Sequence, residues 1–393
     1  MREKGSLGAR VAALAGLALA SLVGCAGPTA TLPRVTPERL ESQTLTVQRK
    51  AVDAALAREA RVRRLAWPII TENAALCPKH RPLMGWRLGD AETVRSLANG
   101  LKASHIAALG FDDTPRILSV APGSPAEAAG LKTGDVIIGL DPEEPVTSLR
   151  EIVRAVGDAL EDWEEGQTLT LAAKRDGEEF TVDVTPVEGC DVRIISSGSN
   201  AINALASFRT ITVYAGLVRA LNDDDQLSFV IAHELAHIAG RHVRKGTRNT
   251  FLSGAALWAP PVYVLARVGD WVTSWPAEQL GAEAPPLTTA AEQLTAKAVG
   301  SGGFEAEADY IGLYMHVRAG RSVETVQDVF QLFSTVSPRT SWLEVTHPVT
   351  PERMLNLQST AEEIAAKQAA GTPLIPEGWA EHIEAYASRK SPD

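Results

Sequence analysis

The sequence lacks a surplus of positive charge and an uninterrupted apolar segment long enough to span a membrane. Its 48 acidic and 38 basic residues give a formal net charge of −10, which excludes the basic surface that a nucleic-acid-binding protein needs. The apolar run at residues 251–266 is interrupted by Pro260-Pro261, so it does not qualify as a transmembrane helix. An apolar content of 45% and a charged content of 22% are ordinary for soluble globular proteins, and 393 residues suffice for two or three domains.

Residues 1–25 have the pattern of a secretory leader. A basic segment precedes the apolar segment Val11–Val23, which is too short to stay in a bilayer as a spanning helix. The leader ends in Leu-Val-Gly-Cys25, which resembles the lipobox of bacterial lipoproteins. This resemblance implies that Cys25 is acylated and anchors the protein in the bacterial cell envelope, and Ala26 fits sorting to the outer membrane, facing the periplasm. The alternative is a plain secretory signal with an incidental cysteine.

Cysteine is scarce, and after Cys25 only Cys77 and Cys190 remain. Two is an even number, and an oxidising compartment favours pairing. Because these cysteines flank a separate module, a disulfide would close the base of that module. The alternative is two buried free thiols.

Composition and periodicity divide the chain into segments. Residues 26–37 are rich in proline and small residues, as linkers are. A helical pattern begins at Thr36-Pro37 and is predicted to end at Trp67-Pro68. We therefore assign residues 26–79 to a linker and N-terminal helix, 80–189 to a second module, 190–375 to a third and 376–393 to a C-terminal tail.

Residues 80–189 combine strand patterns with glycine turns. An alternating strand at Arg116–Val120 is followed by Gly-Ser-Pro-Ala at 123–126 and by Ala-Gly-Leu-Lys-Thr-Gly-Asp-Val-Ile at 129–137. This run resembles the PDZ domains of bacterial envelope proteases. The resemblance implies a β-rich domain with a long helix at Ser148–Leu160 beside a peptide groove, and with closing strands at 168–174 and 179–185.

PDZ domains bind a C-terminal peptide as an added strand and hold its carboxylate on backbone N–H groups. The matching loop is Leu83–Trp86, with Leu109–Phe111 as the alternative. A helical insertion at Ala91–Ala108 departs from the family pattern. The module is therefore either a peptide binder or a spacer.

A His-Glu-Leu-Ala-His motif occupies residues 233–237, within an apolar helical pattern from Gln226 to about Lys245. Residues four apart share one face of a helix, so His233 and His237 can bind the same zinc ion. Glu234 lies about 100° further around the helix, where it can take a proton from a water at the metal. Because buried histidines without a metal would need other partners, the motif predicts one zinc ion per chain rather than two surface histidines.

Three further segments carry a resemblance over about residues 190–360. They are Glu-Ala-Glu-Ala-Asp at 305–309, Asn-Ala at 203–204 followed by Thr210–Leu217, and His-Pro at 347–348 followed by Arg353. With the zinc motif they resemble family forty-eight of the metallopeptidases, the gluzincins that include HtpX-like and CAAX prenyl proteases. The resemblance implies that the segment with Asn203-Ala204 and Thr210–Leu217 forms an edge strand along the substrate cleft.

The same resemblance implies roles for the acidic residues. Glu305 is implied as the third zinc ligand, in preference to Glu307. Glu307 points elsewhere on the helix and is interpreted as a charged surface residue. Asp309 is implied as the carboxylate that orients a ligating histidine.

Three other residues are interpreted from their positions. His347 is implied as a donor to the oxyanion or as a gate of the fourth zinc position, and the alternative is a structural role. Arg353 is expected to pair with a carboxylate, and His242 is interpreted as structural because it lies off the metal-binding face.

These assignments predict an α+β protein, with a mainly helical gluzincin domain containing a small sheet, plus a PDZ-like β-rich domain. The predicted function is that of a zinc-dependent endopeptidase of the cell envelope. By analogy with the family, its expected substrates are misfolded or misassembled proteins. Expected partners are protein or peptide substrates, a C-terminal peptide in the PDZ groove and the membrane through the lipid anchor, but no nucleic acid. The alternatives are a zinc-containing PDZ lipoprotein that acts as a binding or assembly module, and a peptide-binding lipoprotein without metal.

Overall fold

The computed structural model describes residues 33–140, 145–246, 302–335, 347 and 349–388, and the chain separates into two compact units at Thr46/Val47. Cys25 lies outside the described residues, so its lipidation stays a prediction. No helix within the described ranges is both long enough and apolar enough to cross a membrane.

The first helix, α2 (Pro37–Thr71), is longer than predicted because it continues through Pro68. A proline inside a helix removes one N–H donor. Here Trp67, Ile69 and Ile70 around it are buried in the core, and their burial offsets that loss. The prediction that the helix ends at Trp67-Pro68 was therefore wrong.

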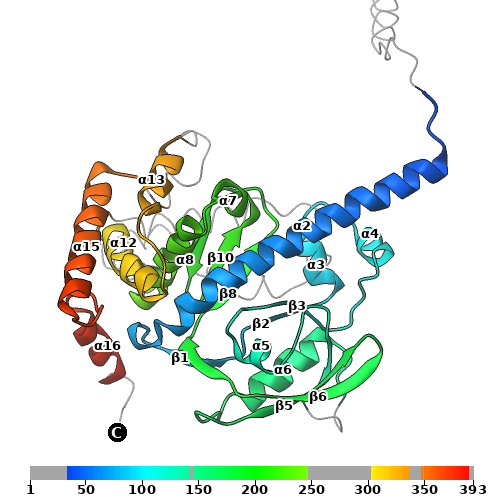
Figure 1. Cartoon of the computed structure of the whole chain (residues 1–393), viewed down its shortest axis with the longest axis horizontal. Helices are drawn as coiled ribbons and strands as arrows, with labels where there is room; N and C mark the ends of the chain where they lie inside the picture. The colour runs from blue at the N-terminus through cyan, green and yellow to red at the C-terminus, as the bar shows by residue number, and fades with distance from the viewer. Residues whose placement is uncertain (1–32, 141–144, 247–301, 336–346, 348, 389–393) are drawn as a thin grey trace, which may run out of the picture. The chain divides into compact units, whose positions relative to one another are not determined.

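The PDZ-like region forms an antiparallel sheet of five strands in the order β2-β3-β4-β5-β6 (Figure 1). The strands are β2 (Trp86–Gly89), β3 (Arg116–Val120), β4 (Val136–Gly139), β5 (Leu169–Arg175) and β6 (Glu178–Val184). The sheet packs with α5 (Pro125–Ala128) and α6 (Leu149–Ala159) around a core that includes Ile117, Ile137, Ile152 and Leu171. Ser148 caps α6 by accepting a hydrogen bond from Glu151 N, as expected for the helix predicted at 148–160.

The insertion in this region forms two helices rather than one, α3 (Ala91–Leu97) and α4 (Ala103–Ala108). Gly100 between them has a φ of +97°, a conformation that ends a helix. Both helices pack in a separate cluster with Val52 and Ala55 of α2 and with Leu118 of β3.

A short ribbon and a disulfide join the PDZ-like region to the rest of the chain. Strand β1 (His80–Leu83) pairs antiparallel with β7 (Val187–Cys190) after the 3₁₀ helix η1 (Ala74–Leu76). Cys77 and Cys190 form a disulfide with a Cα–Cα distance of 5.5 Å. The two cysteines that flank the module are thus bonded across its base.

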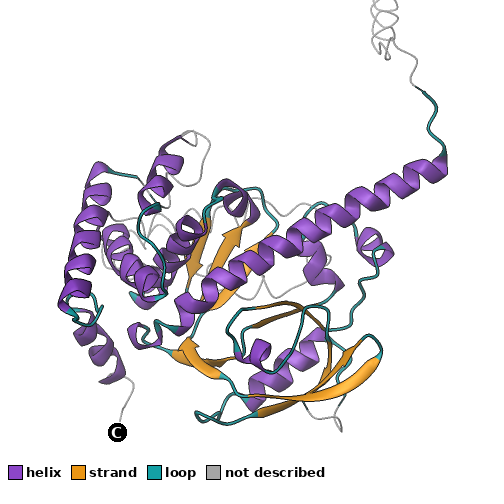
Figure 2. Cartoon of the chain, in the orientation of Figure 1, coloured by secondary structure: helices purple, strands orange, loops and turns teal. Residues whose placement is uncertain are grey.

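The remaining part contains a three-stranded sheet among helices (Figure 2). Strand β10 (Thr210–Tyr214) lies between β8 (Arg193–Ser197), which is parallel to it, and β9 (Ala204–Ser207), which is antiparallel. The helices are α7 (Ala215–Ala220), α8 (Asp224–Ala239), α12 (Gly302–Arg318), α13 (Val326–Thr335), α15 (Pro351–Ala370) and α16 (Trp379–Ala387). The segment expected as one edge strand forms a hairpin instead, in which β9 is the edge strand and β10 is central.

Two helix boundaries also differ from expectation. Helix α8 ends at Ala239 instead of about Lys245, because Gly240 caps it and Arg241 adopts a left-handed φ of 57°. Residues 376–393, predicted as a tail, contain α16, whose buried Trp379 donates a hydrogen bond from Nε1 to Leu76 O at 3.0 Å.

Candidate metal centre

Helix α8 is apolar on nearly all sides and is buried accordingly. Its N-terminus is capped by the Asp223 carboxylate, which accepts hydrogen bonds from Asp225 N and Gln226 N. His233, Glu234 and His237 are each at most 5% exposed on this helix. The helix therefore holds three polar side chains in a dry environment, where each needs a partner.

Helix α12 crosses α8 closely and supplies acidic partners (Figure 1). At the contact stands Gly312, where a Cβ atom would lie 2.9 Å from His233 Cα, so the absence of a side chain permits the approach. Glu305 of α12 is fully buried, with Oε1 3.3 Å from His237 Nε2 and Oε2 3.5 Å from His233 Nε2.

His347 completes a group of four potential metal ligands. Its Nδ1 lies 2.9 Å from Glu305 Oε2 and 3.4 Å from His233 Nε2. One ligand atom from each of His233, His237, Glu305 and His347 lies within 4.8 Å of the other three. The predicted ligands therefore converge on one point, whereas Glu307 stands outside the group.

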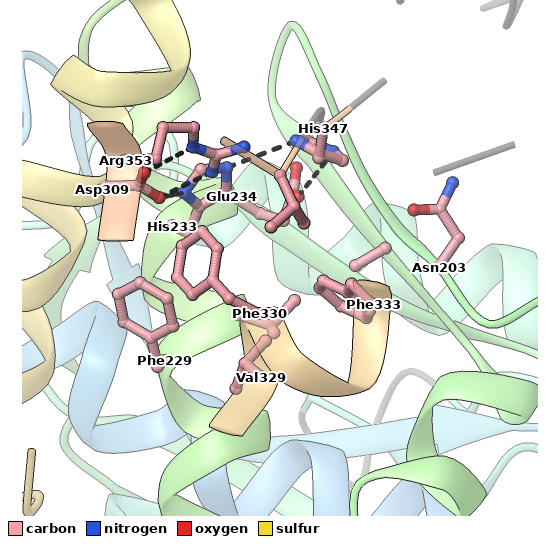
Figure 3. Close-up of a pocket in the computed structure, with 13 residues that line it drawn as sticks. Asn203, Phe229, His233, Glu234, Asp309, Val329, Phe330, Phe333, His347 and Arg353 are labelled. Carbon is pink, nitrogen blue, oxygen red and sulfur yellow. Dashed lines mark hydrogen bonds and ion pairs between the residues drawn. The ribbon is translucent and has the colours of Figure 1, made fainter. Parts of the chain in front are cut away.

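Asp309 and Arg353 lie beside His233 (Figure 3). Asp309 Oδ1 is 3.0 Å from His233 Nδ1, the ring nitrogen that faces away from the group. Arg353 donates two hydrogen bonds to the Asp309 carboxylate, from Nε at 2.6 Å and from Nη2 at 2.8 Å. This bidentate pair fixes the carboxylate that contacts the histidine.

The electrostatics of the group are those of a site prepared for a cation. Burial disfavours a charge on His233, but the carboxylates of Asp309 and Glu305 outweigh burial and raise the pKa of His233 to about 10. Burial lowers the pKa of His237 to about 3. One imidazole thus holds a proton between two carboxylates, and a metal ion bound here would take the place of this proton.

The ring of His237 has a partner that we did not expect from the sequence. His242 is fully buried, with Nδ1 2.9 Å from His237 Nδ1 and Nε2 3.0 Å from Glu307 Oε2. We interpreted His242 as structural because a continued helix would place it off the metal-binding face. Helix α8 ends before that point, at Ala239 with Gly240 as its cap, so His242 can contact His237. Gly240 itself, as a helix-stop residue, was the signal that could have indicated this.

A small cavity of about 30 Å³ adjoins the group (Figure 3). Besides His233, Glu234, His347 and Arg353, its lining is mainly apolar and comes from Phe229, Val230, Val329, Phe330, Phe333 and Val349. Ala204, the first residue of the edge strand β9, and Asn203 before it also line the cavity. The cavity therefore presents apolar side chains next to the metal ligands.

Two family profiles match the chain: Peptidase family M48 over residues 184–361 and the PDZ domain over residues 82–185. The serine protease HTRA1 of Xenopus tropicalis is 43% identical over 72 residues, which are 18% of this chain and 14% of that relative. The chain thus spans about a seventh of that relative's length.

Solved structures resemble 28% of the chain. One is the HtrA3 PDZ domain bound to a phage-derived ligand, with 17% identity, 88% of that chain covered and a TM-score of 0.21. Another is the serine endoprotease from Yersinia pestis, with 21% identity, 29% of that chain covered and a TM-score of 0.19.

The two profiles adjoin near residue 185, and the M48 match contains both helices of the ligand group. Residues 184–361 therefore belong to peptidase family M48, and they directly follow a PDZ domain at residues 82–185.

Proposed function

We propose that the protein is a zinc-dependent endopeptidase of the bacterial cell envelope that cleaves unfolded or misassembled proteins. The observation that carries this proposal is the convergence of His233, His237 and Glu305 beside Glu234 and an apolar cavity. Two imidazoles and one carboxylate are a ligand set used by catalytic zinc sites.

Unpartnered buried atoms support a bound cation. Glu305 Oε1 and Glu234 Oε2 are buried and accept no hydrogen bond from the described part of the chain. Buried carboxylate oxygens normally have a partner. A zinc ion held by His233, His237 and Glu305 would supply the Lewis acidity that polarises a peptide carbonyl and acidifies a water.

Glu234 is placed to move the proton. It is 1% exposed, and its Oε2 atom has no hydrogen-bond donor among the described residues. As a general base it takes a proton from the attacking water and then gives it to the leaving amine. Asp309 and Arg353 keep the His233 ring in place during both transfers.

The cavity supports the proposed substrate class. Its apolar lining from α8 and α13 favours apolar substrate side chains next to the scissile bond, and a large one would enter only as the lining moves apart. Such side chains are mostly buried in folded proteins. A chain that exposes them near a cleavable bond is unfolded or misassembled.

We also propose that the PDZ-like region binds a peptide. Strand β2 is at the edge of the described five-stranded sheet and follows Gly85, whose φ is +81°. A Cβ at Gly85 would collide with Ser124, so this loop is shaped around glycine. A peptide added to β2 would face α6, where Val153 is 55% exposed.

The proposed location rests on the leader and on the disulfide. The lipobox-like residues before Cys25 favour a lipid-anchored protein at the outer membrane, facing the periplasm. A disulfide such as Cys77–Cys190 is typical of oxidising compartments.

One observation favours a second function. His347 stands with the three other ligands, and four protein ligands are typical of closed, structural zinc sites. With His347 bound, the protein would act as a zinc-containing binding or assembly module with little proteolysis.

The test offers the purified full chain a model substrate protein in two forms, native and unfolded by reduction and alkylation. Cleavage of each form is measured. The expected result is chelator-sensitive cleavage of the unfolded form alone, restored by zinc, with cuts beside large apolar residues. Absence of cleavage by the zinc-loaded chain, both as wild type and as His347→Ala, would favour the binding module. Cuts without any apolar preference would contradict the assignment of the cavity.

A further inference from the structure

The two ring nitrogens of His237 face different surroundings. Nε2 faces the ligand group, 3.3 Å from Glu305 Oε1 and 3.0 Å from His233 Nε2. Nδ1 faces away and lies 2.9 Å from His242 Nδ1. The far nitrogen of His242 lies 3.0 Å from Glu307 Oε2.

With Glu307 ionised and His242 neutral, these contacts determine the direction of each hydrogen bond. An ionised carboxylate only accepts, so His242 Nε2 must donate to Glu307. In neutral His242 the other nitrogen, Nδ1, is then an acceptor, and His237 Nδ1 must donate to it. His237 Nε2 is left with a lone pair that faces the ligand group.

The surroundings hold this arrangement in place. His242 is fully buried, and Phe304 stacks on its ring at a centroid distance of 4.9 Å and an interplanar angle of 19°. Any side chain at position 240 would collide with the ring, so Gly240 permits its placement. Lys245 Nζ lies 3.8 Å from Glu307 Oε2 and favours the ionised carboxylate.

The two ligand histidines are therefore supported in parallel ways. His233 Nδ1 contacts the carboxylate of Asp309 directly, at 3.0 Å. His237 Nδ1 reaches the carboxylate of Glu307 through the intervening imidazole of His242. Groups that contact the far nitrogen of a ligating histidine set its tautomer and orientation.

We propose that His242 and Glu307 are positioning residues for the metal, which hold His237 in the tautomer whose Nε2 can bind it. The pair acts through His237 and does not contact substrate. The proposal rests on the metal site in the proposed function, but not on peptide hydrolysis.

The test measures zinc affinity by chelator competition in full-chain variants. His242→Phe keeps an aromatic ring against Phe304 but removes both nitrogens, and Glu307→Ala removes the acceptor. Each is expected to weaken zinc binding by about 10- to 100-fold. Glu307→Gln keeps an acceptor oxygen and is expected to lose less.

The matched control is His316→Phe. His316 is also buried, but its Nε2 contacts Ser322 O at 2.7 Å, away from the ligand group. This variant is expected to keep wild-type zinc affinity even if its thermal midpoint falls. Circular dichroism checks that each variant is folded.

A second readout is independent of affinity. Long-range ¹H–¹⁵N spectra of the zinc-loaded imidazoles are expected to show the His237 Nδ1 proton in the wild type, in slow exchange with water. In Glu307→Ala this proton is expected to exchange faster, because the chain of hydrogen bonds has lost its final acceptor. A merely structural role for Glu307 would leave that exchange rate unchanged.

Folded His242→Phe and Glu307→Ala chains with wild-type zinc affinity would overturn the proposal. A wild-type chain that binds no zinc would overturn it together with the proposed function. A wild-type chain that binds zinc tightly without cleaving protein would contradict only the proteolysis, and the affinity comparison would still decide the role of the pair.

Discussion

His347 lies between a proposed metal ligand and the proposed base, so a single ring contacts both. Its Nδ1 is 2.9 Å from Glu305 Oε2, and its Nε2 is 3.3 Å from Glu234 Oε1. Catalytic zinc sites keep one position open for water and substrate. With His347 in this place, its ring would fill that position of a bound zinc ion, and its contact engages Glu234.

We therefore expect His347→Ala to raise the rate of cleavage of an unfolded protein by about tenfold. This estimate takes the fourth zinc position of the wild type to be open for about one-tenth of the time, and that of the variant to be always open. The three other ligands remain, so zinc content is expected to stay at one ion per chain. Initial rates at saturating substrate, with zinc determined on the same sample, check this. A fall in kcat at full zinc content would show instead that His347 serves as an oxyanion donor.

At the scale of elements, α2 connects the PDZ-like sheet with the helix that carries the ligands. Glu59 of α2 is 1% exposed, and its Oε1 lies 3.0 Å from Arg63 Nη2 and 3.7 Å from Arg87 Nε of β2. Two residues further on, Arg61 pairs with Asp224 in the first turn of α8. Residues two apart lie about 200° apart around a helix, so α2 carries charged contacts to the two parts on different faces.

We expect Glu59→Gln to lower the free energy of unfolding by about 3 kcal/mol, because it leaves two partly buried arginines without their carboxylate. Glu41→Gln, on the exposed part of the same helix, is the control and is expected to change it by less than about 0.5 kcal/mol. Urea unfolding of both variants at neutral pH measures the difference. Equal midpoints in the two variants would contradict a role for this ion pair.

The same pair predicts a pH dependence. Burial raises the pKa of Glu59, but Arg63 and Arg87 outweigh burial and lower it below the ordinary value. A carboxyl group with a lowered folded-state pKa stabilises the fold above its unfolded pKa of about 4.3, and this contribution is lost as the pH falls through the folded pKa. The difference in unfolding free energy between wild type and Glu59→Gln is expected to shrink below about pH 4. A difference that stays constant from pH 7 to pH 3 would exclude ionisation of Glu59 as its cause.

The helix boundaries that sequence reasoning misplaced are those decided by tertiary contacts. Pro68 is a local stop signal, yet α2 continues because the residues around it are buried in a core that includes distant segments. Strand β10 is central rather than at an edge because β9 pairs with it through a hairpin that was not recognised. Helix α6 was predicted well because its cap and period are local features.

At the scale of the whole molecule, the Cys77–Cys190 disulfide closes a loop that contains the PDZ-like region, with a sequence separation of 113 residues. A crosslink over a long loop restricts the unfolded chain and thereby favours the folded one. The bond also ties η1 to the end of β7.

Replacing both cysteines by alanine is expected to lower the free energy of unfolding by roughly 2–5 kcal/mol. Urea unfolding with and without a reductant checks this. The reductant is expected to shift the midpoint of the wild type and to leave that of the double variant in place. A double variant as stable as the oxidised wild type would contradict the expectation.

The metal centre was predictable in part. His233, Glu234 and His237 follow from spacing within one helix, and the roles of Glu305, Asp309 and His347 came from the family resemblance. The contact between His242 and Glu307 depends on the turn after Gly240 and on the crossing of α12, neither of which is a local pattern.

The central claim is that Glu234 is the base of a zinc-dependent peptidase, and Glu234→Gln tests it most directly. Zinc content and cleavage of an unfolded protein would be measured on the same samples of wild type and variant. We expect one zinc ion per chain in both, and a rate in the variant that is lower by about 10²- to 10⁴-fold. A zinc-loaded variant that cleaves as fast as the wild type would contradict the account.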